Sequence, residues 1–209
     1  MKKSAIFGMW LSACSTWAQP STAEADLLRL MEGTLYTVSH RETADGRLSA
    51  CGLEFNVIAR DHATRAGAAV QGIGSFYLRR MGANFAYALK LGVRDGINPE
   101  ARPFAPSNAF VRPPRGNAPT TRAIRTESDT PGYALYLGAL DDDIARVYQS
   151  ITEQRRFIVG FNRRAGQQDV NLDIDLSVKA ARMEGNRLVR DRTSEMVDEF
   201  NACVGDLLK

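Results

Sequence analysis

The amino-acid sequence predicts a mainly β fold with two or three helices (α+β), arranged as an antiparallel sandwich or open barrel and packed by a C-terminal helix. Three observations lead to this prediction. Several short stretches alternate apolar and polar residues, as half-buried strands do. Turn-forming pairs such as Asp-Gly and Gly-Asn separate these stretches. The C-terminal stretch repeats apolar side chains at helical spacing.

The N-terminus has the features of a bacterial export signal. Met1-Lys2-Lys3 precedes an apolar run from Ala5 to Ala13, and no acidic residue occurs before Glu24. This run is far shorter than the roughly 20 residues that span a membrane. We therefore expect residues 1–18 to be a signal peptide and residues 19–209 to form a single β-rich domain in the periplasm.

A second processing site competes with the first. Leu11-Ser12-Ala13-Cys14 resembles the lipobox of bacterial lipoproteins. That resemblance implies removal of residues 1–13 and acylation of Cys14, which would tether the protein to the outer membrane. The two routes stay open, and a possible lipid at Cys14 is the sole link to a membrane that we expect.

The charge of the chain gives little reason to expect nucleic acid as a partner. Loss of Lys2 and Lys3 lowers the net charge from +3 to +1, so no general attraction to polyanions remains. Arginine strongly outnumbers lysine in the remaining chain. This bias reflects genome composition or, alternatively, recognition of carboxylates and phosphates by guanidinium groups.

The first half of the domain predicts a helix followed by a β-meander. A short helix is expected within 19–33, where Ser21-x-x-Glu24 resembles a capping box. Alternating patterns then predict strands, with a turn at Ala44-Asp45-Gly46 and a polar connection over residues 61–69. These strands cover residues 35–41, 51–57, 70–80 and 85–93. Gly72 and Gly74 indicate curvature, a bulge or a close backbone approach.

Residues 97–122 are predicted to be a long Pro-rich loop, because six of the eight prolines fall between Pro99 and Pro119. A connection of this length is either solvated or functional. As a functional loop it would be a flap over a cleft or a docking segment. Its candidate binding residues are Arg102, Phe104, Phe110, Arg112 and Arg115.

Strand patterns resume at residues 123–125 and 133–140, and Asp141-Asp142-Asp143 opens a helix that carries Ile144, Val147, Tyr148 and Ile151 on one face. The final hairpin is expected to pair Phe161 with Leu172, Val159 with Ile174 and Phe157 with Leu176. This register leaves residues 165–168 as the loop, with Arg164 opposite Asp169. Leu188 and Val189 add a further short strand.

Both processing routes leave Cys51 and Cys203 as the remaining pair of cysteines, and we expect them to form a disulfide in an oxidising compartment. Cys51 shares a strand face with Leu53 and Phe55, and Cys203 lies in the apolar stripe of a helix spanning residues 193–208. The bond would staple the terminal helix to the sheet. A redox role would need an exposed thiolate, and these patterns argue against one.

No motif in the sequence identifies a catalytic, cofactor or metal site. The weak catalytic candidates are His62, with Asp61 as a group that could orient its ring, and His40, which is expected to be a partly buried, hydrogen-bonded histidine. Asn171, Asp173 and Asp175 share one strand face, which we expect to be solvated or paired with arginine rather than to bind a cation. No cofactor is expected.

The leading functional hypothesis is an exported, non-enzymatic binding or structural module of the cell envelope. Its partner would be an envelope protein, a glycan or a small ligand. One alternative is a periplasmic hydrolase with its site near Asp61 and His62. Another is an apolar-ligand carrier in which the small residues Gly72, Gly74, Ala86 and Ala88 leave room inside a curved sheet.

Overall fold

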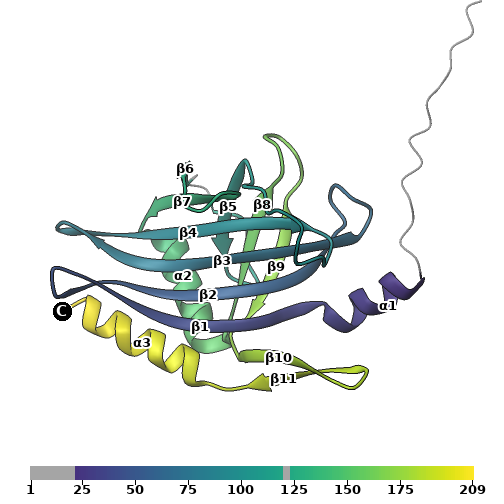
Figure 1. Ribbon diagram of the computed structural model, residues 1–209. Helices are drawn as coiled ribbons and strands as arrows, with labels where there is room; N and C mark the ends of the chain where they lie inside the picture. Colours follow the sequence, from purple (N-terminus) through teal and green to yellow (C-terminus); the bar gives the residue numbers. More distant parts are fainter. Residues whose placement is uncertain (1–21, 120–122) are drawn as a thin grey trace, which may run out of the picture.

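A computed structural model describes residues 22–119 and 123–209 (Figure 1). Its eight-stranded antiparallel sheet has the strand order β11-β10-β1-β2-β3-β4-β7-β6. The strands of this large sheet are β1 (Gly33–Ala44), β2 (Arg47–Asp61), β3 (Ala68–Met81), β4 (Asn84–Asp95), β6 (Ile124–Glu127), β7 (Tyr133–Ala139), β10 (Val178–Glu184) and β11 (Arg187–Arg192). A three-stranded sheet of order β5-β8-β9 contains β5 (Asn108–Arg112), β8 (Arg156–Asn162) and β9 (Val170–Asp175).

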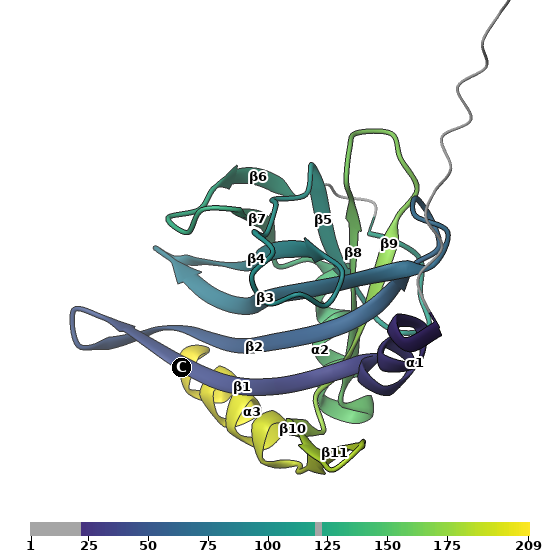
Figure 2. The same ribbon diagram turned by 45° about the vertical axis from the view of Figure 1, so that its right-hand side comes forward.

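Three helices accompany the two sheets: α1 (Thr22–Met31), α2 (Asp142–Gln154) and α3 (Glu195–Leu207). The small sheet and α2 lie on one side of β1–β4, and α3 runs along β1 and β2 (Figure 2). This confirms the predicted mainly β fold packed by a C-terminal helix. No helix in the described part of the chain is long and apolar enough to cross a membrane.

The large sheet has two chemically different faces. We call the face that carries Leu53, Phe55, Phe76 and Leu89 the inner face, since all four side chains are fully buried. Phe157 of the small sheet contacts Phe55 and Phe76 with ring centroids 5.9 and 5.8 Å away. Strand alternation places the intervening residues on the outer face.

The predicted disulfide is present and ties α3 to the inner face. Cys51 and Cys203 are bonded, with their Cα atoms 5.8 Å apart. Both are buried, and Phe200 and Leu207 pack from the same helix face. A disulfide is typical of an oxidising, extracytoplasmic compartment.

Several local predictions are also confirmed. The Asp141 side chain accepts a hydrogen bond from the Ile144 amide at 3.0 Å and so caps α2 as expected. Asp45 and Gly46 form the left-handed turn between β1 and β2. The proposed signal peptide, Cys14 and the Ser21 capping box lie outside the described residues.

The Pro-rich segment is not a loop throughout, because it contains β5. Ala109 and Val111 are fully buried, and the strand pairs with β8 at the edge of the small sheet. Prolines exclude a central strand but not an edge strand between them. The flanking Pro106 and Pro113 therefore leave room for five paired residues.

The register expected for the last hairpin is wrong by two residues. Phe157 pairs with Ile174 and Val159 with Leu172, so residues 163–169 form a longer turn and Asp169 faces Asn162 instead of Arg164. A two-residue shift keeps every side chain on its predicted face. Alternation of apolar and polar residues predicts the face of each side chain, but it is the same in these two registers and does not distinguish them.

Candidate functional site

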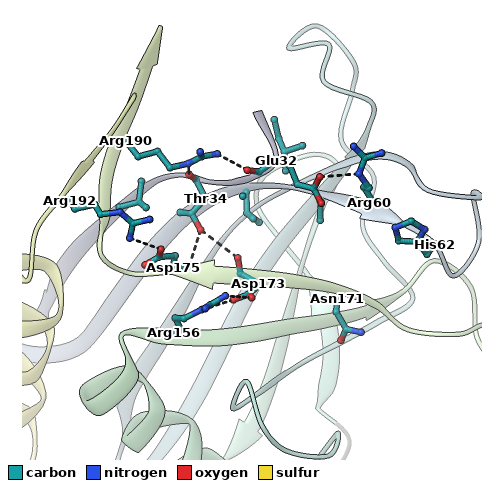
Figure 3. Close-up of a pocket in the computed structure, with 15 residues that line it drawn as sticks. Glu32, Thr34, Arg60, His62, Arg156, Asn171, Asp173, Asp175, Arg190 and Arg192 are labelled. Atoms are coloured by element: carbon teal, nitrogen blue, oxygen red, sulfur yellow. Dashed lines mark hydrogen bonds and ion pairs between the residues drawn. The ribbon is translucent and has the colours of Figure 1, made fainter. Parts of the chain in front are cut away.

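A groove of about 460 Å³ lies where the two sheets meet. It lies between the start of β1, the end of β2, strand β9 and the β10–β11 hairpin (Figure 3). Ten polar or charged residues line it: Glu32, Thr34, Arg60, His62, Arg156, Asn171, Asp173, Asp175, Arg190 and Arg192. We refer to this cavity as the arginine groove.

Thr34 joins the two sheets at one side of the groove. Its hydroxyl accepts a hydrogen bond from the Asp175 amide at 2.8 Å and lies 3.5 Å from the Asp173 carbonyl oxygen. A threonine side chain thus satisfies part of the exposed edge of β9, where a neighbouring strand would otherwise bind. Asn171 follows two residues further along this edge and lines the groove.

Three carboxylates in the groove are paired with arginine. Glu32 binds Arg60 with an oxygen–nitrogen distance of 2.9 Å. Asp175 binds Arg192 at 2.9 Å. Asp173 receives two hydrogen bonds from Arg156, through Nε and Nη2. The predicted acidic row of β9 is therefore paired with arginine.

Hydrogen bonds favour the charged forms of Asp175 and Arg156. Burial alone would raise the pKa of Asp175, but bonds from Ser177 and Arg192 outweigh it and hold the pKa below its ordinary value. The hydrogen bond from Arg156 to Asp173 raises the pKa of that guanidinium, since it favours the charged form.

Arg190 differs from the other three arginines because backbone carbonyls hold it. Its guanidinium donates to the carbonyl oxygens of Thr34 at 2.9 Å, Glu32 at 2.6 Å and Met31 at 3.3 Å. The Met31 and Glu32 carbonyls lie at the C-terminal end of α1, where helix carbonyls lack intrahelical partners. Within the described residues Arg190 has no carboxylate partner. The groove as a whole is lined by four guanidinium groups and three carboxylates.

Asp61 and His62 do not form the predicted dyad. Asp61 is fully buried and accepts bonds from Thr64 Oγ1 at 2.6 Å and from Arg163 Nε at 2.8 Å. His62 is exposed at the rim of the arginine groove, and its ring packs beside Gly67. The carboxylate closes the turn between β2 and β3, so it does not orient the neighbouring imidazole.

His40 lies on the outer face, as its strand pattern predicts. Its Nε2 is 3.0 Å from Glu54 Oε2, and both side chains are about two-fifths exposed at 37% and 40%. The Tyr36 hydroxyl donates to the other carboxylate oxygen of Glu54 at 2.7 Å. This cluster lies on a different side of the sheet from Asp61.

The candidate binding residues of the Pro-rich segment separate into three groups. Phe110 is buried against Gly160, and the ring of Phe104 is covered by the guanidinium of Arg163 at 5.0 Å. Arg112 donates to the carbonyl oxygens of residues 113, 114 and 116, so it holds the loop together. Arg102 and Arg115 are exposed and available to a partner.

The four small residues proposed to leave room for an apolar ligand do not share a face. Gly72 and Gly74 lie on the inner face, whereas Ala86 and Ala88 lie on the outer face, as their pairing with Arg79 and Tyr77 shows. Leu172 of β9 fills the space above Gly72. The glycines therefore allow the close approach of the second sheet, which is one of the roles predicted for them.

The arginines of the groove were not predicted as a site. Arg190 and Arg192 belong to a hairpin of which the sequence indicated only the second strand. The arginine-rich composition and the acidic row of β9 were the available signals, but they did not show which arginines meet which acids. Among the described residues, no three metal-ligating side chains gather at one place.

Comparison with known proteins adds no assignment to this geometry. The chain matches none of the family models, curated proteins or solved structures against which we compared it.

Proposed function

We propose that the protein is an exported binding module of the cell envelope, non-enzymatic, that holds a small anionic ligand in the arginine groove. The observation that carries this proposal is the gathering of four guanidinium groups around one cavity, with one more positive than negative side chain. Guanidinium groups bind carboxylates and phosphates through paired N–H donors.

The arginines retain donors for a ligand. Arg60 uses only Nε for its bond to Glu32, and Arg192 uses only Nη1 for Asp175 and Ser177. Arg190 uses Nε and Nη2 for carbonyls. The remaining N–H groups of these side chains have no partner among the described residues. Their protein partners hold the guanidinium planes in place, which lowers the entropic cost of binding.

The environment of Asp61 favours binding over the alternative of hydrolysis near His62. That carboxylate is occupied by Thr64 and Arg163, so it supplies neither a base nor an orienting group to the exposed imidazole. The filled space above Gly72 likewise gives the apolar-carrier alternative less support than the polar groove gives anion binding.

We place this module in the periplasm, either soluble or tethered to the outer membrane by a lipid on Cys14. The disulfide between Cys51 and Cys203 supports an oxidising compartment. The export-type N-terminus supports the same placement. Mass spectrometry of the N-terminal peptide from the membrane and soluble fractions would distinguish an acylated Cys14 from cleavage after Ala18.

The groove can be tested with a matched pair of arginine variants. Isothermal titration of the exported chain with citrate and with inorganic phosphate should show binding that weakens as salt rises. Arg192→Gln should weaken it about 10-fold, the loss of one charged hydrogen bond. Arg182→Gln is the control, because Arg182 is on the same hairpin, is ion-paired with Asp191, and is 53% exposed against 59% for Arg192.

Two results would contradict the proposal. Equal binding by Arg192→Gln and Arg182→Gln would show that the groove is not the site. Turnover of ester, peptide or glycan substrates by the native protein, lost in His62→Ala, would favour the hydrolase instead.

A further inference from the structure

The outer face of the large sheet contains a second cavity that the arginine groove does not include. It measures about 280 Å³ and lies over the middle strands β2, β3 and β4. Helix α1 covers only one end of this face, where Leu28 packs with Ile58 and Ala69. In Figure 1 the middle of the sheet carries no further helix on the side turned to the viewer.

Two tyrosine rings at this cavity lie on glycines of the neighbouring strand. A methyl group added at Gly92 would be 2.7–2.8 Å from Cδ1, Cε1 and Cζ of Tyr133. These nearly equal distances mean that the ring covers the glycine with its face. A methyl group at Gly52 would overlap the ring of Tyr77 in the same way.

This arrangement explains two glycines that turn geometry does not require. Gly52 and Gly92 lie inside regular strands and have no positive φ. Glycine inside a strand costs stability, so a compensating contact is expected. Here the contact is the aromatic ring, and both tyrosines stay partly exposed. Lys90 Nζ lies 5.8 Å from the centroid of the Tyr133 ring, so an ammonium group stands beside this aromatic surface.

Polar side chains lie between the two rings in one row across the sheet. Glu54 pairs in register with Ser75, and Ser75 pairs with Lys90. Alternation of side chains then places all three on the same face, and all three line the cavity. His40 and Tyr36 fix Glu54, and Asp129 and Thr130 fix Lys90 at 2.9 and 2.8 Å.

We propose that this outer-face cavity binds a neutral oligosaccharide. The carbon-bound hydrogens of a pyranose ring suit an aromatic face, and its hydroxyls suit a carboxylate, a hydroxyl and an ammonium group. Glu54 and Lys90 cancel in charge, so the cavity is complementary to an uncharged ligand. Gly52 and Gly92, which lie under the two tyrosine rings, are four residues apart along the strands and two strands apart. This corresponds to a separation of about 16 Å, which is longer than one sugar ring.

The sheet geometry disfavours a peptide at the same place. Each of β2, β3 and β4 is hydrogen-bonded to a strand on both sides, so this face offers no free edge for strand addition. A sugar needs only side-chain contacts, and this face supplies them.

The test uses the exported chain with tetra-N-acetylchitotetraose and maltotetraose as probes, and N-acetylglucosamine and glucose as single-ring controls. Isothermal titration should detect at least one tetrasaccharide, with a Kd at least 10-fold lower than for the corresponding single sugar. Tyr77→Ala and Tyr133→Ala should each weaken this binding at least 10-fold. Tyr77→Phe should stay within about twofold because it keeps the ring.

Tyr148→Ala is the matched control, since Tyr148 is a partly exposed tyrosine on α2 that packs on Phe200 away from this cavity. Thermal unfolding of each variant establishes that it is folded. Absence of tetrasaccharide binding by the folded native chain would overturn the proposal, as would unchanged binding by both alanine variants. Arg192→Gln should not affect sugar binding, so this site and the arginine groove succeed or fail separately.

Discussion

Gly72 on the inner face and Gly52 and Gly92 on the outer face of the large sheet make room for side chains in different settings. On the inner face, Gly72 makes room for Leu172 of the second sheet, and that leucine is fully buried. On the outer face, Gly52 and Gly92 make room for tyrosine rings from the same sheet, and those rings remain partly exposed. The same residue type therefore supports a packed core on one side and a partly exposed aromatic surface on the other.

Charged groups on the two faces also differ in how deeply they are buried. Asp61 on the inner face is fully buried, and its partner Arg163 is 14% exposed. Glu54 on the outer face binds His40 in a half-exposed pair. Breaking a buried pair is costly because the remaining group is poorly hydrated; here it is Arg163, which keeps Asp95 as a second partner at 2.6 Å. The groups of a broken exposed pair are hydrated instead. The inner face should thus respond strongly to substitution and the outer face weakly.

Removing the disulfide should have the largest effect on stability. The bond joins residues 152 positions apart, and loop-closure entropy for such a separation corresponds to about 5 kcal/mol. The double variant Cys51→Ala, Cys203→Ala should unfold about 10–20 °C below the native chain. Differential scanning calorimetry in matched buffers measures this.

Reduction of the native chain provides the control for that variant. A reductant should lower the midpoint temperature of unfolding of the native chain by a similar amount. The same reductant should not change the midpoint of the double variant. A midpoint within 3 °C of the native value would show that packing of α3, rather than its covalent bond, holds it to the inner face.

Asp61→Asn should come next, with a loss of about 3 kcal/mol in the free energy of unfolding. Glu54→Gln, the outer-face counterpart, should lose less than about 1 kcal/mol. Urea denaturation at pH 7 compares the two. Equal losses would contradict the difference that we assign to the faces.

The pH dependence of Asp61→Asn sharpens this comparison. Burial alone would raise the pKa of Asp61, but bonds from Thr64 and Arg163 outweigh it and lower the pKa. A carboxyl whose pKa is lowered by folding contributes stability above its unfolded pKa, about 3.9, and loses it as pH falls. The difference in the free energy of unfolding between the native chain and Asp61→Asn should therefore be constant from pH 7 to about pH 5 and become smaller below about pH 4.

Much of this architecture could be predicted because alternation and helical spacing record burial directly. Cys51, Leu53 and Phe55 show a core-facing strand, and Phe200 with Cys203 shows a core-facing helix, so the disulfide followed from two local patterns. β10 could not be found in this way. Only Val178 is buried in that strand, and its position depends on pairing with β1 at Tyr36 and Ala180.

The two proposed binding surfaces were harder to predict because they depend on contacts between distant segments. Arg192 meets Asp175 only after the β10–β11 hairpin has added to the large sheet. Likewise, the alternation of residues 85–93 assigns Gly92 to the face opposite Leu91, but it cannot show that Tyr133 of β7 will cover that glycine. Alternation along a strand therefore predicts the face on which a residue lies, whereas the side chain that covers it is determined by tertiary packing.

Alanine at the glycines should cost less stability than Asp61→Asn, and it should distinguish the two faces most clearly. A methyl group at Gly74 would overlap the carbonyl oxygen of Lys90, a backbone atom of the adjacent strand, so β3 or β4 must move. We expect a loss of about 2 kcal/mol. The three atoms nearest to a methyl group at Gly52 all belong to the ring of Tyr77, a partly exposed side chain that we expect to move more easily than a strand backbone. Replacing a strand glycine also reduces the entropy of the unfolded chain, so Gly52→Ala should change the free energy of unfolding by less than about 1 kcal/mol.

Gly52→Ala should nevertheless weaken tetrasaccharide binding about 10-fold, because the displaced ring no longer forms part of the flat surface. Chemical denaturation and sugar titration on both variants measure the two quantities together. A strong loss of stability in Gly52→Ala, with sugar binding unchanged, would mean that the tyrosine acts as packing for the sheet and not as a platform for a ligand.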